Sequence, residues 1–371
     1  MELNYDAFLN RMFINAGANG VPLGGSFELT ADCPLDCKMC YIHQKDCRIS
    51  DRQKEKDTAW WLDLIKKAKA KGMLLVLLTG GEPLMRKDFK EIYIACKDSG
   101  FLVSVNTNGV LINDEIIALF QKYPPQRVNV TLYGTCAQTY KNLCGSESAF
   151  EKTVTAIKKL KNAGINVKLN YSVTPYNCCD CESALNFAKT QNLKIQPVTY
   201  MYPPINNSIA ETRLCEEDAA KEHFLWQHRL LGDEDMLKYI RNLNKQQSGS
   251  PADADCGEKI NCRAGLSTLW VTFDGYMLPC GMMSTPKIKI KDFDEAWQFI
   301  RHERENIILP KECNDCEDRN FCDMCAAVAY AETGEYGGVP RYACKKAKEY
   351  KKLCNNFVKN FESEFSGGNE K

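Results

Sequence analysis

Three cysteines lie close together in the segment CPLDCKMCY, which runs from Cys33 to Tyr41. Their spacing, C-x3-C-x2-C, differs from that of a structural zinc site, which normally closes with four ligands at short paired spacing. A four-iron cluster takes one terminal ligand on each iron, so three thiolates would leave one iron open to a small molecule. The alternatives are a truncated zinc site and three incidental cysteines in a loop. The pattern therefore predicts a metal centre at Cys33, Cys37 and Cys40.

A second group of cysteines follows much later in the chain, and its eight members could close two complete four-thiolate sites. CxxC pairs suit zinc as well as iron, and without the N-terminal motif two structural zinc ions would be the favoured interpretation. The eight are Cys256, Cys262, Cys280, Cys313, Cys316, Cys322, Cys325 and Cys344.

The composition excludes several classes of protein. The chain has 371 residues and 20 cysteines, and Lys+Arg and Asp+Glu both total 48. A formal net charge of zero argues against a nucleic-acid-binding protein, whose footprint would be basic. There is no signal-peptide pattern at the N-terminus, and no apolar run approaches the length of about 18 residues that a membrane helix needs. We expect a cytoplasmic protein whose cysteines are metal ligands, reactive thiols or small buried side chains, and not disulfides. Many metal-bound thiolates would also suggest an anaerobic habitat.

The elements that must position the first cysteines alternate regularly between about residues 26 and 200. Short apolar runs bounded by Gly, Pro or Asn are typical of buried parallel strands. Amphipathic patterns between them predict helices, for example from Trp60 to Ala68 and from Phe150 to Leu160. The expected strands are Phe27–Thr30, Met73–Leu78, Leu102–Asn106, Arg127–Leu132, Val167–Val173 and Leu193–Val198.

This alternation predicts an α/β fold with a parallel sheet. Six strand–helix units are too few for a closed eight-stranded barrel, so we expect an open, partial (βα)6 TIM-like barrel. In such folds the chemistry gathers in the loops that follow the strands, which is where the three-cysteine loop lies.

C-x3-C-x2-C after a first strand is the signature of the radical S-adenosylmethionine (SAM) superfamily, and roughly residues 25–200 of this chain resemble it. The resemblance implies that SAM binds the fourth iron through its amino and carboxylate groups. One electron from the cluster would then cleave SAM to a 5′-deoxyadenosyl radical, which abstracts a hydrogen atom from the substrate. Met39 and Tyr41 flank the last cysteine and could pack near the adenine, and a plain core role is an equal alternative.

The segment after the second strand strengthens the resemblance. Gly80, Gly81, Glu82 and Pro83 match the superfamily's GGEP motif, at a strand end where ligands are expected. A lone Gly-Gly would only indicate a turn. The resemblance implies that carbonyl groups and the carboxylate of this motif hold the ammonium group of SAM.

Three more strand ends resemble segments that contact the cofactor in this superfamily. The segment VNTNGV could be a plain Asn-Gly turn, but in register with the other motifs it resembles the TNG segment. The fourth strand ends on a hydroxyl residue expected near SAM, and the fifth ends where backbone contacts to adenine and ribose are usually found. The resemblance implies cofactor contacts from Asn106, Thr107, Asn108, Thr131, Asn170 and Val173.

The C-terminal region resembles the SPASM extension of radical SAM enzymes, a cysteine-rich, cluster-binding domain with two auxiliary [4Fe–4S] clusters. The resemblance implies an inner cluster held by Cys256, Cys262, Cys280 and Cys325 and an outer cluster held by Cys313, Cys316, Cys322 and Cys344. Together with the SAM-binding cluster, three [4Fe–4S] clusters are expected. The spacing from Cys322 to Cys325 is one residue shorter than usual, so the loop must absorb a deletion.

These features divide the chain into five predicted parts. They are an N-terminal extension at 1–25, the radical SAM partial barrel at 26–204, a helical connector and linker at 205–255, the SPASM domain at 256–350 and a C-terminal tail at 351–371.

Several further cysteines follow the fourth and fifth strands. A thiol near the active site could donate a hydrogen atom to a substrate radical, as in radical epimerases, if its exposure and pKa allow. Inert buried or surface cysteines are the alternative. The candidates are Cys136, Cys144, Cys178, Cys179 and Cys181, and no other catalytic residue can be named from the sequence.

The functional hypothesis is a radical SAM/SPASM oxidoreductase that modifies a ribosomal peptide by a thioether or carbon–carbon crosslink or a related oxidation. The peptide is a family-level analogy. Oxidation of a substrate radical releases an electron that the auxiliary clusters could receive. An external one-electron donor such as flavodoxin or ferredoxin would reduce the first cluster.

Three alternatives stay open. One is a radical epimerase or dehydrogenase of a small molecule. Another is a sulfatase-maturase-like enzyme, although Gly281 stands where such maturases carry an Asp after the Gly-x4-Cys cysteine. The last is a zinc-binding scaffold, which would be colourless. Three filled clusters would instead give a brown protein with roughly twelve irons per chain.

Overall fold

The computed structural model describes residues 5–42, 53–204, 208–245, 259–260 and 262–366. Its strands are β1 (Gly24–Glu28), β2 (Leu75–Thr79), β3 (Leu102–Thr107), β4 (Arg127–Thr131), β5 (Val167–Ser172), β6 (Lys194–Val198), β7 (Thr268–Val271), β8 (Tyr276–Leu278) and β9 (Ile288–Lys289). Its helices are α1 (Tyr5–Ala18), α3 (Thr58–Ala70), α4 (Phe89–Asp98), α5 (Asp114–Lys122), α6 (Ala137–Cys144), α7 (Ala149–Asn162), α8 (Cys181–Thr190), α9 (Ile209–Thr212), α10 (Glu216–Leu231), α11 (Asp233–Lys245), α12 (Phe293–Arg304), α13 (Ala326–Thr333) and α14 (Arg341–Ser366). Short 3-10 turns are η2 (Pro83–Met85), η3 (Cys178–Asp180), η4 (Lys311–Cys313) and η5 (Arg319–Phe321).

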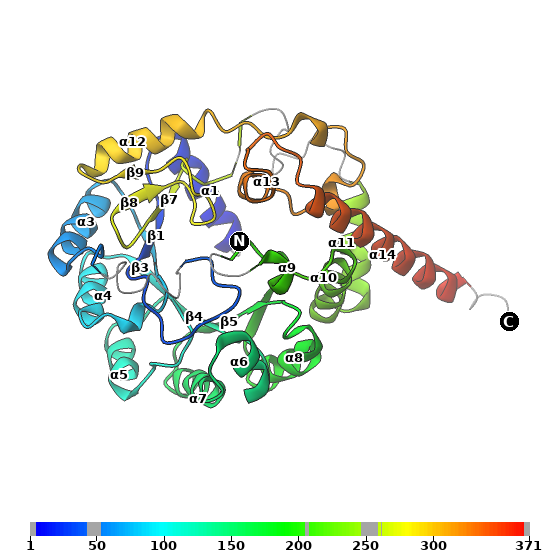
Figure 1. The fold of residues 1–371 in the computed structure, drawn as a ribbon, viewed down its shortest axis with the longest axis horizontal. Helices are drawn as coiled ribbons and strands as arrows, with labels where there is room; N and C mark the ends of the chain where they lie inside the picture. The colour runs from blue at the N-terminus through cyan, green and yellow to red at the C-terminus, as the bar shows by residue number, and fades with distance from the viewer. Residues whose placement is uncertain (1–4, 43–52, 205–207, 246–258, 261, 367–371) are drawn as a thin grey trace.

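The strands form one sheet in the order β6-β5-β4-β3-β2-β1-β7-β8-β9. Strands β1 to β6 are all parallel and are joined through helices that cover the outside of the curved sheet (Figure 1). Because β6 lies at one end of the sheet, the barrel is open. The predicted α/β fold with a partial (βα)6 TIM-like barrel is confirmed, with the observed strand boundaries within three residues of the expected ones.

Successive side chains along a strand point to opposite faces of the sheet, so one face is apolar and the other carries polar residues. Apolar residues such as Phe27, Val105 and Val130 pack into the main core under the helices, where Phe27 lies 5.7 Å from the ring of Trp61. Burying such side chains is the principal driving force for the fold. Polar residues at intervening positions, such as Asn106, face the hollow side of the barrel and are available to bind a ligand.

The C-terminal region is more closely joined to the barrel than expected. Strand β7 pairs in parallel with β1, from Gly24 with Thr268 to Phe27 with Val271, and β8 and β9 continue the sheet in antiparallel fashion. Helix α12 contributes Trp297 to the main core. Residues 268–304 therefore share the core of the barrel, because their strands extend the sheet beyond its first strand.

The remaining C-terminal helices form a layer beside the open end of the barrel. Helix α14 packs along α10 and α11 and then projects away from the body of the molecule (Figure 1). The predicted boundary at residue 350 falls inside this continuous helix, whereas the predicted linker beyond residue 245 lies outside the described residues. Among the described helices, none has both the length and the hydrophobicity that crossing a bilayer requires.

Candidate active site

The three-cysteine loop leaves β1 and is bound directly to the end of β2. The backbone N–H of Gly81 donates to Thr30 O at 2.8 Å, and that of Glu82 donates to Asp32 O at 2.7 Å. These bonds continue the parallel pairing of β1 with β2 beyond both strands. They therefore place Cys33, the next residue, at the edge of the barrel mouth.

Glycine is required at this contact. A Cβ atom on Gly81 would lie 2.4 Å from Asp32 O, and one on Gly80 would lie 2.4 Å from Thr30 O. Gly80 also has φ of +143°, which side-chain-bearing residues rarely adopt. The glycines of the GGEP motif thus have a structural role here, because they let two backbone segments approach each other closely.

Glu82 occupies the next position and is fully buried. Its carboxylate accepts hydrogen bonds from the backbone N–H of Asn108 at 2.7 Å, from the Thr107 hydroxyl at 2.9 and 3.0 Å and from the N–H of Leu84 at 3.2 Å. Burial raises the pKa of Glu82 to about 7, although these hydrogen bonds oppose the shift. Neither Glu82 nor Pro83 lines the cavity described below, so direct contact between this carboxylate and an ammonium group stays a prediction.

The far end of the cysteine loop rests on helix α6. The N–H of Asp36 donates to Cys144 O at 3.0 Å, and the N–H of Lys38 donates to Leu143 O at 2.9 Å. Cys33 and Leu35 pack with Leu143 in a small apolar cluster beneath the loop. The loop is therefore fixed at both ends by its own backbone.

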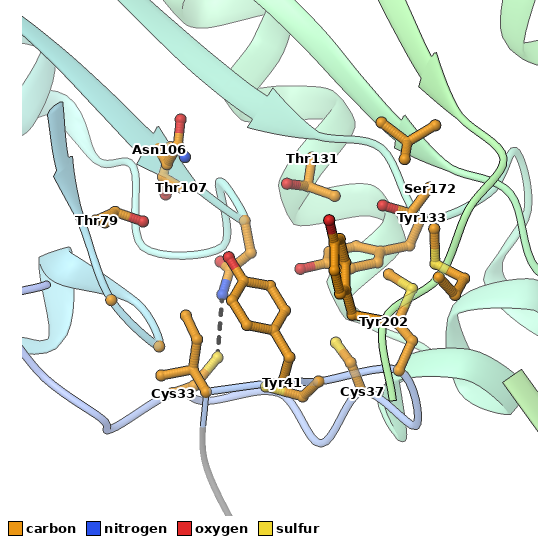
Figure 2. A pocket seen from close by; sticks show the side chains of 18 of the residues that line it. Cys33, Cys37, Tyr41, Thr79, Asn106, Thr107, Thr131, Tyr133, Ser172 and Tyr202 are labelled. Carbon is orange, nitrogen blue, oxygen red and sulfur yellow. Dashed lines mark hydrogen bonds between the residues drawn. The ribbon is translucent and has the colours of Figure 1, made fainter. Parts of the chain in front are cut away.

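A cavity of about 330 Å³ opens above this loop, at the carboxyl ends of β2 to β6 (Figure 2). All three motif cysteines line it. In Figure 2, Cys33, Cys37 and Tyr41 lie on one side, and the strand-end residues Thr131 and Ser172 lie across from them. The other lining residues are Met39, Cys40, Ile42, Thr79, Gly80, Gly81, Asn106, Thr107, Asn108, Tyr133, Val198, Tyr200, Met201, Tyr202 and Met282.

Most of the residues predicted to contact a cofactor lie on this cavity. They are Met39, Tyr41, Gly80, Gly81, Asn106, Thr107, Asn108 and Thr131. Asn170 and Val173 do not line it. The side chain of Val173 packs into the main core, because strand alternation turns it toward the helices, and Ser172 takes the place at the cavity.

The sequence analysis did not predict nine of the lining residues, which are Ile42, Thr79, Tyr133, Ser172, Val198, Tyr200, Met201, Tyr202 and Met282. Two of them could have been found, because Tyr133 and Ser172 lie two residues beyond Thr131 and Asn170 and so share their side of the sheet. Met282 gave no such signal, since it comes from the C-terminal region, more than eighty residues after β6.

The five candidate thiol donors do not line this cavity. Cys136 is exposed at the start of α6, where its Sγ accepts from Thr139 N at 3.5 Å. Cys144 is buried behind the loop, and its hydrogen bond with Cys37, together with burial, raises the pKa of Cys37. Cys178, Cys179 and Cys181 belong to η3 and the start of α8. Hydrogen-atom donation by any of them has no supporting contact at the cavity.

The donor set of the loop suits a SAM-binding iron–sulfur cluster. Burial raises the pKa of Cys33, and coordination by a metal would remove the proton. The Asn108 side-chain amide donates to Cys33 Sγ at 3.5 Å, shown as a dashed line in Figure 2. Within the described residues, no three Cys, His, Asp or Glu side chains converge on the position of a single metal ion. In a four-iron cluster each thiolate binds a different iron, so the cysteine sulfur atoms need not converge on one position.

Six of the later cysteines fall into two groups of neighbours. Cys256 lies outside the described residues, and Cys313 lies in an apolar cluster that Cys280 and Cys322 both contact. Burial raises the pKa of Cys280, and nearby Cys325 and Cys262 raise it further. Burial likewise raises the pKa of Cys344, with a contribution from nearby Cys316. Burial and then Cys344 raise the pKa of Cys322 to about 12. Cys325 therefore lies near Cys280 and Cys262. Cys322 is only three residues away in the sequence but lies near Cys344, in the other group.

Comparison with known protein families agrees with the geometry. The family described as the radical SAM superfamily matches residues 27–188, the span that contains the cysteine loop and most of the cavity wall. This segment is a radical SAM domain. Its cysteine loop, its GGEP segment and its polar strand ends come together in one cavity.

The chain is similar to two curated proteins named AdoMet-dependent heme synthase. The protein from Methanosarcina barkeri is 27% identical over 330 residues, which cover 84% of this chain and 93% of the relative. The protein from Oleidesulfovibrio alaskensis is 22% identical over 329 residues, with 84% of each chain covered.

Two solved structures have the same fold. Streptococcus suis SuiB bound to precursor peptide SuiA is 18% identical, with a TM-score of 0.68 over 92% of this chain and 82% of that one. Native anSMEcpe with bound AdoMet and Kp18Cys peptide is 16% identical, with a TM-score of 0.69 over 92% of this chain and 99% of that one. At these identities the likeness concerns the fold alone.

Proposed function

We propose that this protein is a radical SAM oxidoreductase of the SPASM subfamily that oxidatively modifies a peptide. The observation that carries the proposal is the convergence of Cys33, Cys37 and Cys40 with the strand-end residues on one cavity. When bound, a reduced [4Fe–4S] cluster supplies the electron that cleaves SAM to a 5′-deoxyadenosyl radical.

The chain's own residues would hold and shield these groups. Cys33, Cys37 and Cys40 would ligate three irons, and SAM would take the fourth. The amide of Asn108 would hydrogen-bond the sulfur of Cys33. The hydroxyl groups of Thr131 and Ser172 face the cavity and could orient polar groups of SAM, while aromatic and thioether side chains exclude water from the radical.

The grouping of the later cysteines supports two auxiliary [4Fe–4S] clusters. Cys262, Cys280 and Cys325 would hold the inner cluster together with Cys256, and Cys313, Cys316, Cys322 and Cys344 would hold the outer one. Four thiolates at each cluster leave no open iron, so these centres would carry electrons and would not bind substrate. A flavodoxin or ferredoxin is the proposed external donor for the first cluster.

The cavity favours a peptide as the substrate. Its volume of about 330 Å³ is at the lower end of the range of about 300–1,000 Å³ that ligand pockets span. SAM would fill most of it, so only one reacting group, such as a side chain of an extended peptide, could enter. The structures of SuiB with precursor peptide SuiA and of anSMEcpe with Kp18Cys peptide are consistent with this choice.

A second candidate function follows from the curated relatives, whose shared name is AdoMet-dependent heme synthase. A porphyrin-type substrate would bring carboxylate side chains. Apart from its three thiols, the described lining of the cavity consists of neutral side chains and glycines, which offer no positive charge to those carboxylates. We therefore place the peptide first and the porphyrin second.

A sulfatase-maturase-like reaction is disfavoured by the surroundings of Gly281. A Cβ atom at this position would lie 2.6 Å from the ring of Trp270. The indole N–H of Trp270 donates to the buried carboxylate of Glu28 at 2.9 Å, which fixes the ring in place. The aspartate that such maturases carry here would have no space.

The experiment offers both substrate classes to anaerobically reconstituted, reduced enzyme with SAM. The probes are synthetic peptides that tile the short open reading frames beside the gene, and an iron porphyrin with propionate side chains. We expect a peptide product lighter by two hydrogen atoms, with matching 5′-deoxyadenosine. Conversion of the porphyrin with unchanged peptides would replace the first candidate by the second. A colourless protein that binds zinc and little iron would contradict both and leave the zinc scaffold.

A further inference from the structure

Tyr202 lies between the cavity and one of the later cysteines. Its side chain lines the cavity together with Tyr41 and Met282. Its hydroxyl oxygen lies 3.8 Å from Cys325 Sγ, within hydrogen-bonding range for sulfur. The side chain therefore connects the radical SAM domain to the C-terminal cysteines.

Neighbouring residues hold Tyr202 in this position. The ring of Tyr200 lies 5.1 Å from that of Tyr202 in an edge-on arrangement, at an interplanar angle of 78°. The Tyr200 hydroxyl donates to Glu332 on α13 at 3.0 Å, and the same carboxylate accepts from the N–H of Tyr342 at 3.1 Å. The rings of Tyr200 and Tyr342 lie 5.9 Å apart, and Tyr342 is two residues from Cys344. Ring contacts therefore run from the cavity into the cysteine-rich region.

The direction of the hydrogen bond follows from the chemistry of a metal-bound cysteine. A coordinated thiolate carries no proton, so only the phenol can donate. An ordinary phenol keeps its proton at neutral pH, so the hydroxyl of Tyr202 has a proton to donate. Hydrogen bonds to cluster sulfurs are among the factors that set the potential of an iron–sulfur centre. A hydrogen bond donated to a cluster sulfur stabilises the reduced state of the cluster, because that state carries more negative charge.

We propose that Tyr202 is a positioning residue that hydrogen-bonds the metal-bound sulfur of Cys325 and raises the reduction potential of the auxiliary centre beside the cavity. This inference rests on the proposed function. With SAM and the clusters bound, the 5′-deoxyadenosyl radical would take one hydrogen atom from the substrate. The substrate radical would then give one electron to the auxiliary centre and one proton to solvent, so the product would be lighter by two hydrogen atoms. A higher potential makes the centre a better acceptor for that electron.

The test isolates the auxiliary centres in the full-length protein. The triple variant Cys33→Ala, Cys37→Ala, Cys40→Ala removes the ligands of the first cluster and serves as the parent. Tyr202→Phe is added to it, which removes only the hydroxyl. Redox titration followed by electron paramagnetic resonance should show one auxiliary centre at a lower potential. A tenfold change in the reduction equilibrium corresponds to about 59 mV for one electron.

Tyr133→Phe in the same parent is the matched control. Tyr133 also lines the cavity, but its hydroxyl hydrogen-bonds with Cys37 and with none of the C-terminal cysteines that the structure describes. This variant should leave the auxiliary potentials unchanged. In the otherwise unmutated protein, Tyr133→Phe should shift the reduction potential of the SAM-binding cluster. The two tyrosines should therefore affect the potentials of different clusters.

Two results would overturn the inference. Only the second would also contradict part of the proposed function. If the parent retains its iron and Tyr202→Phe leaves both auxiliary potentials unchanged, Tyr202 has no effect on the centre and the proposed function stands. If the parent retains no iron, the C-terminal cysteines hold no clusters. That result would also contradict the auxiliary part of the proposed function.

Discussion

The carboxylate of Glu82 accepts a 2.7 Å hydrogen bond from the backbone N–H of Asn108, which joins the ends of β2 and β3 beneath the cavity. The same Asn108 donates through its side chain to Cys33 at 3.5 Å. Two strands and the cysteine loop thus meet at one buried contact. Glu82 positions the site through Asn108, whether or not it also touches SAM.

Replacing Glu82 by Ala should destabilise the protein, because the Thr107 hydroxyl and the Asn108 N–H would lose a buried acceptor. Each unsatisfied donor costs about 1–3 kcal/mol. Urea unfolding of the apo-protein measures the loss. As the control, Glu115→Ala removes a carboxylate that is 70% exposed and should change the unfolding free energy by less than about 0.5 kcal/mol. Equal stabilities for the two variants would contradict the assigned role of Glu82.

Replacing Gly81 by Ala should displace the cysteine loop, because the new Cβ would lie 2.4 Å from Asp32 O. We expect a loss of about 1–3 kcal/mol, typical of overpacking, and less iron after reconstitution. Gly337→Ala is the control, since its Cβ would be 3.8 Å from the nearest atom, Ile308 O. Full iron loading of the Gly81 variant would show that the loop does not depend on this close approach.

Glu28 should make stability depend on pH. Burial raises its pKa to about 7, although the hydrogen bond from Trp270 opposes the shift and nearby Asp274 adds to it. Between pH 4.5 and 7 the folded protein therefore binds this proton more tightly than the unfolded chain does. Its contribution to stability is present below pH 4.5 and is lost as the pH rises through about 7.

Glu28→Gln removes this titration and keeps an acceptor for the Trp270 indole. Relative to this variant, the unmutated protein should lose up to about 3 kcal/mol of unfolding free energy between pH 4.5 and 7. Chemical unfolding of both apo-proteins at several pH values measures the difference. A constant difference across this range would show that Glu28 titrates normally.

The barrel could be predicted because its signals are local. The apolar run Val167–Val173 and the helical pattern from Phe150 to Leu160 each indicate, from their own residues, which side chains are buried. The alternation of strands and helices then allows few topologies. The cysteine loop could be predicted for the same reason, since Cys33, Cys37 and Cys40 are neighbours in sequence as well as in space.

Contacts between distant segments could not be predicted in this way. The pairing of β1 with β7 joins Gly24 to Thr268, and no periodicity within either segment specifies the partner. The same holds for Met282 at the cavity and for the contact between Tyr202 and Cys325. The hydrogen bonds that Glu82 accepts from Thr107 and Asn108 could not be predicted either, because a motif match does not say which neighbours its residues contact.

The central claim is that Cys33, Cys37 and Cys40 form the site of SAM cleavage. The most direct measurement is the amount of 5′-deoxyadenosine formed from SAM by the anaerobically reconstituted, reduced protein. The parent should form it, and so should a control in which Cys136, Cys178 and Cys179, all outside the cavity, are replaced by Ala. The variant with Cys33, Cys37 and Cys40 replaced by Ala should form none. Persistent formation by that variant would contradict the account.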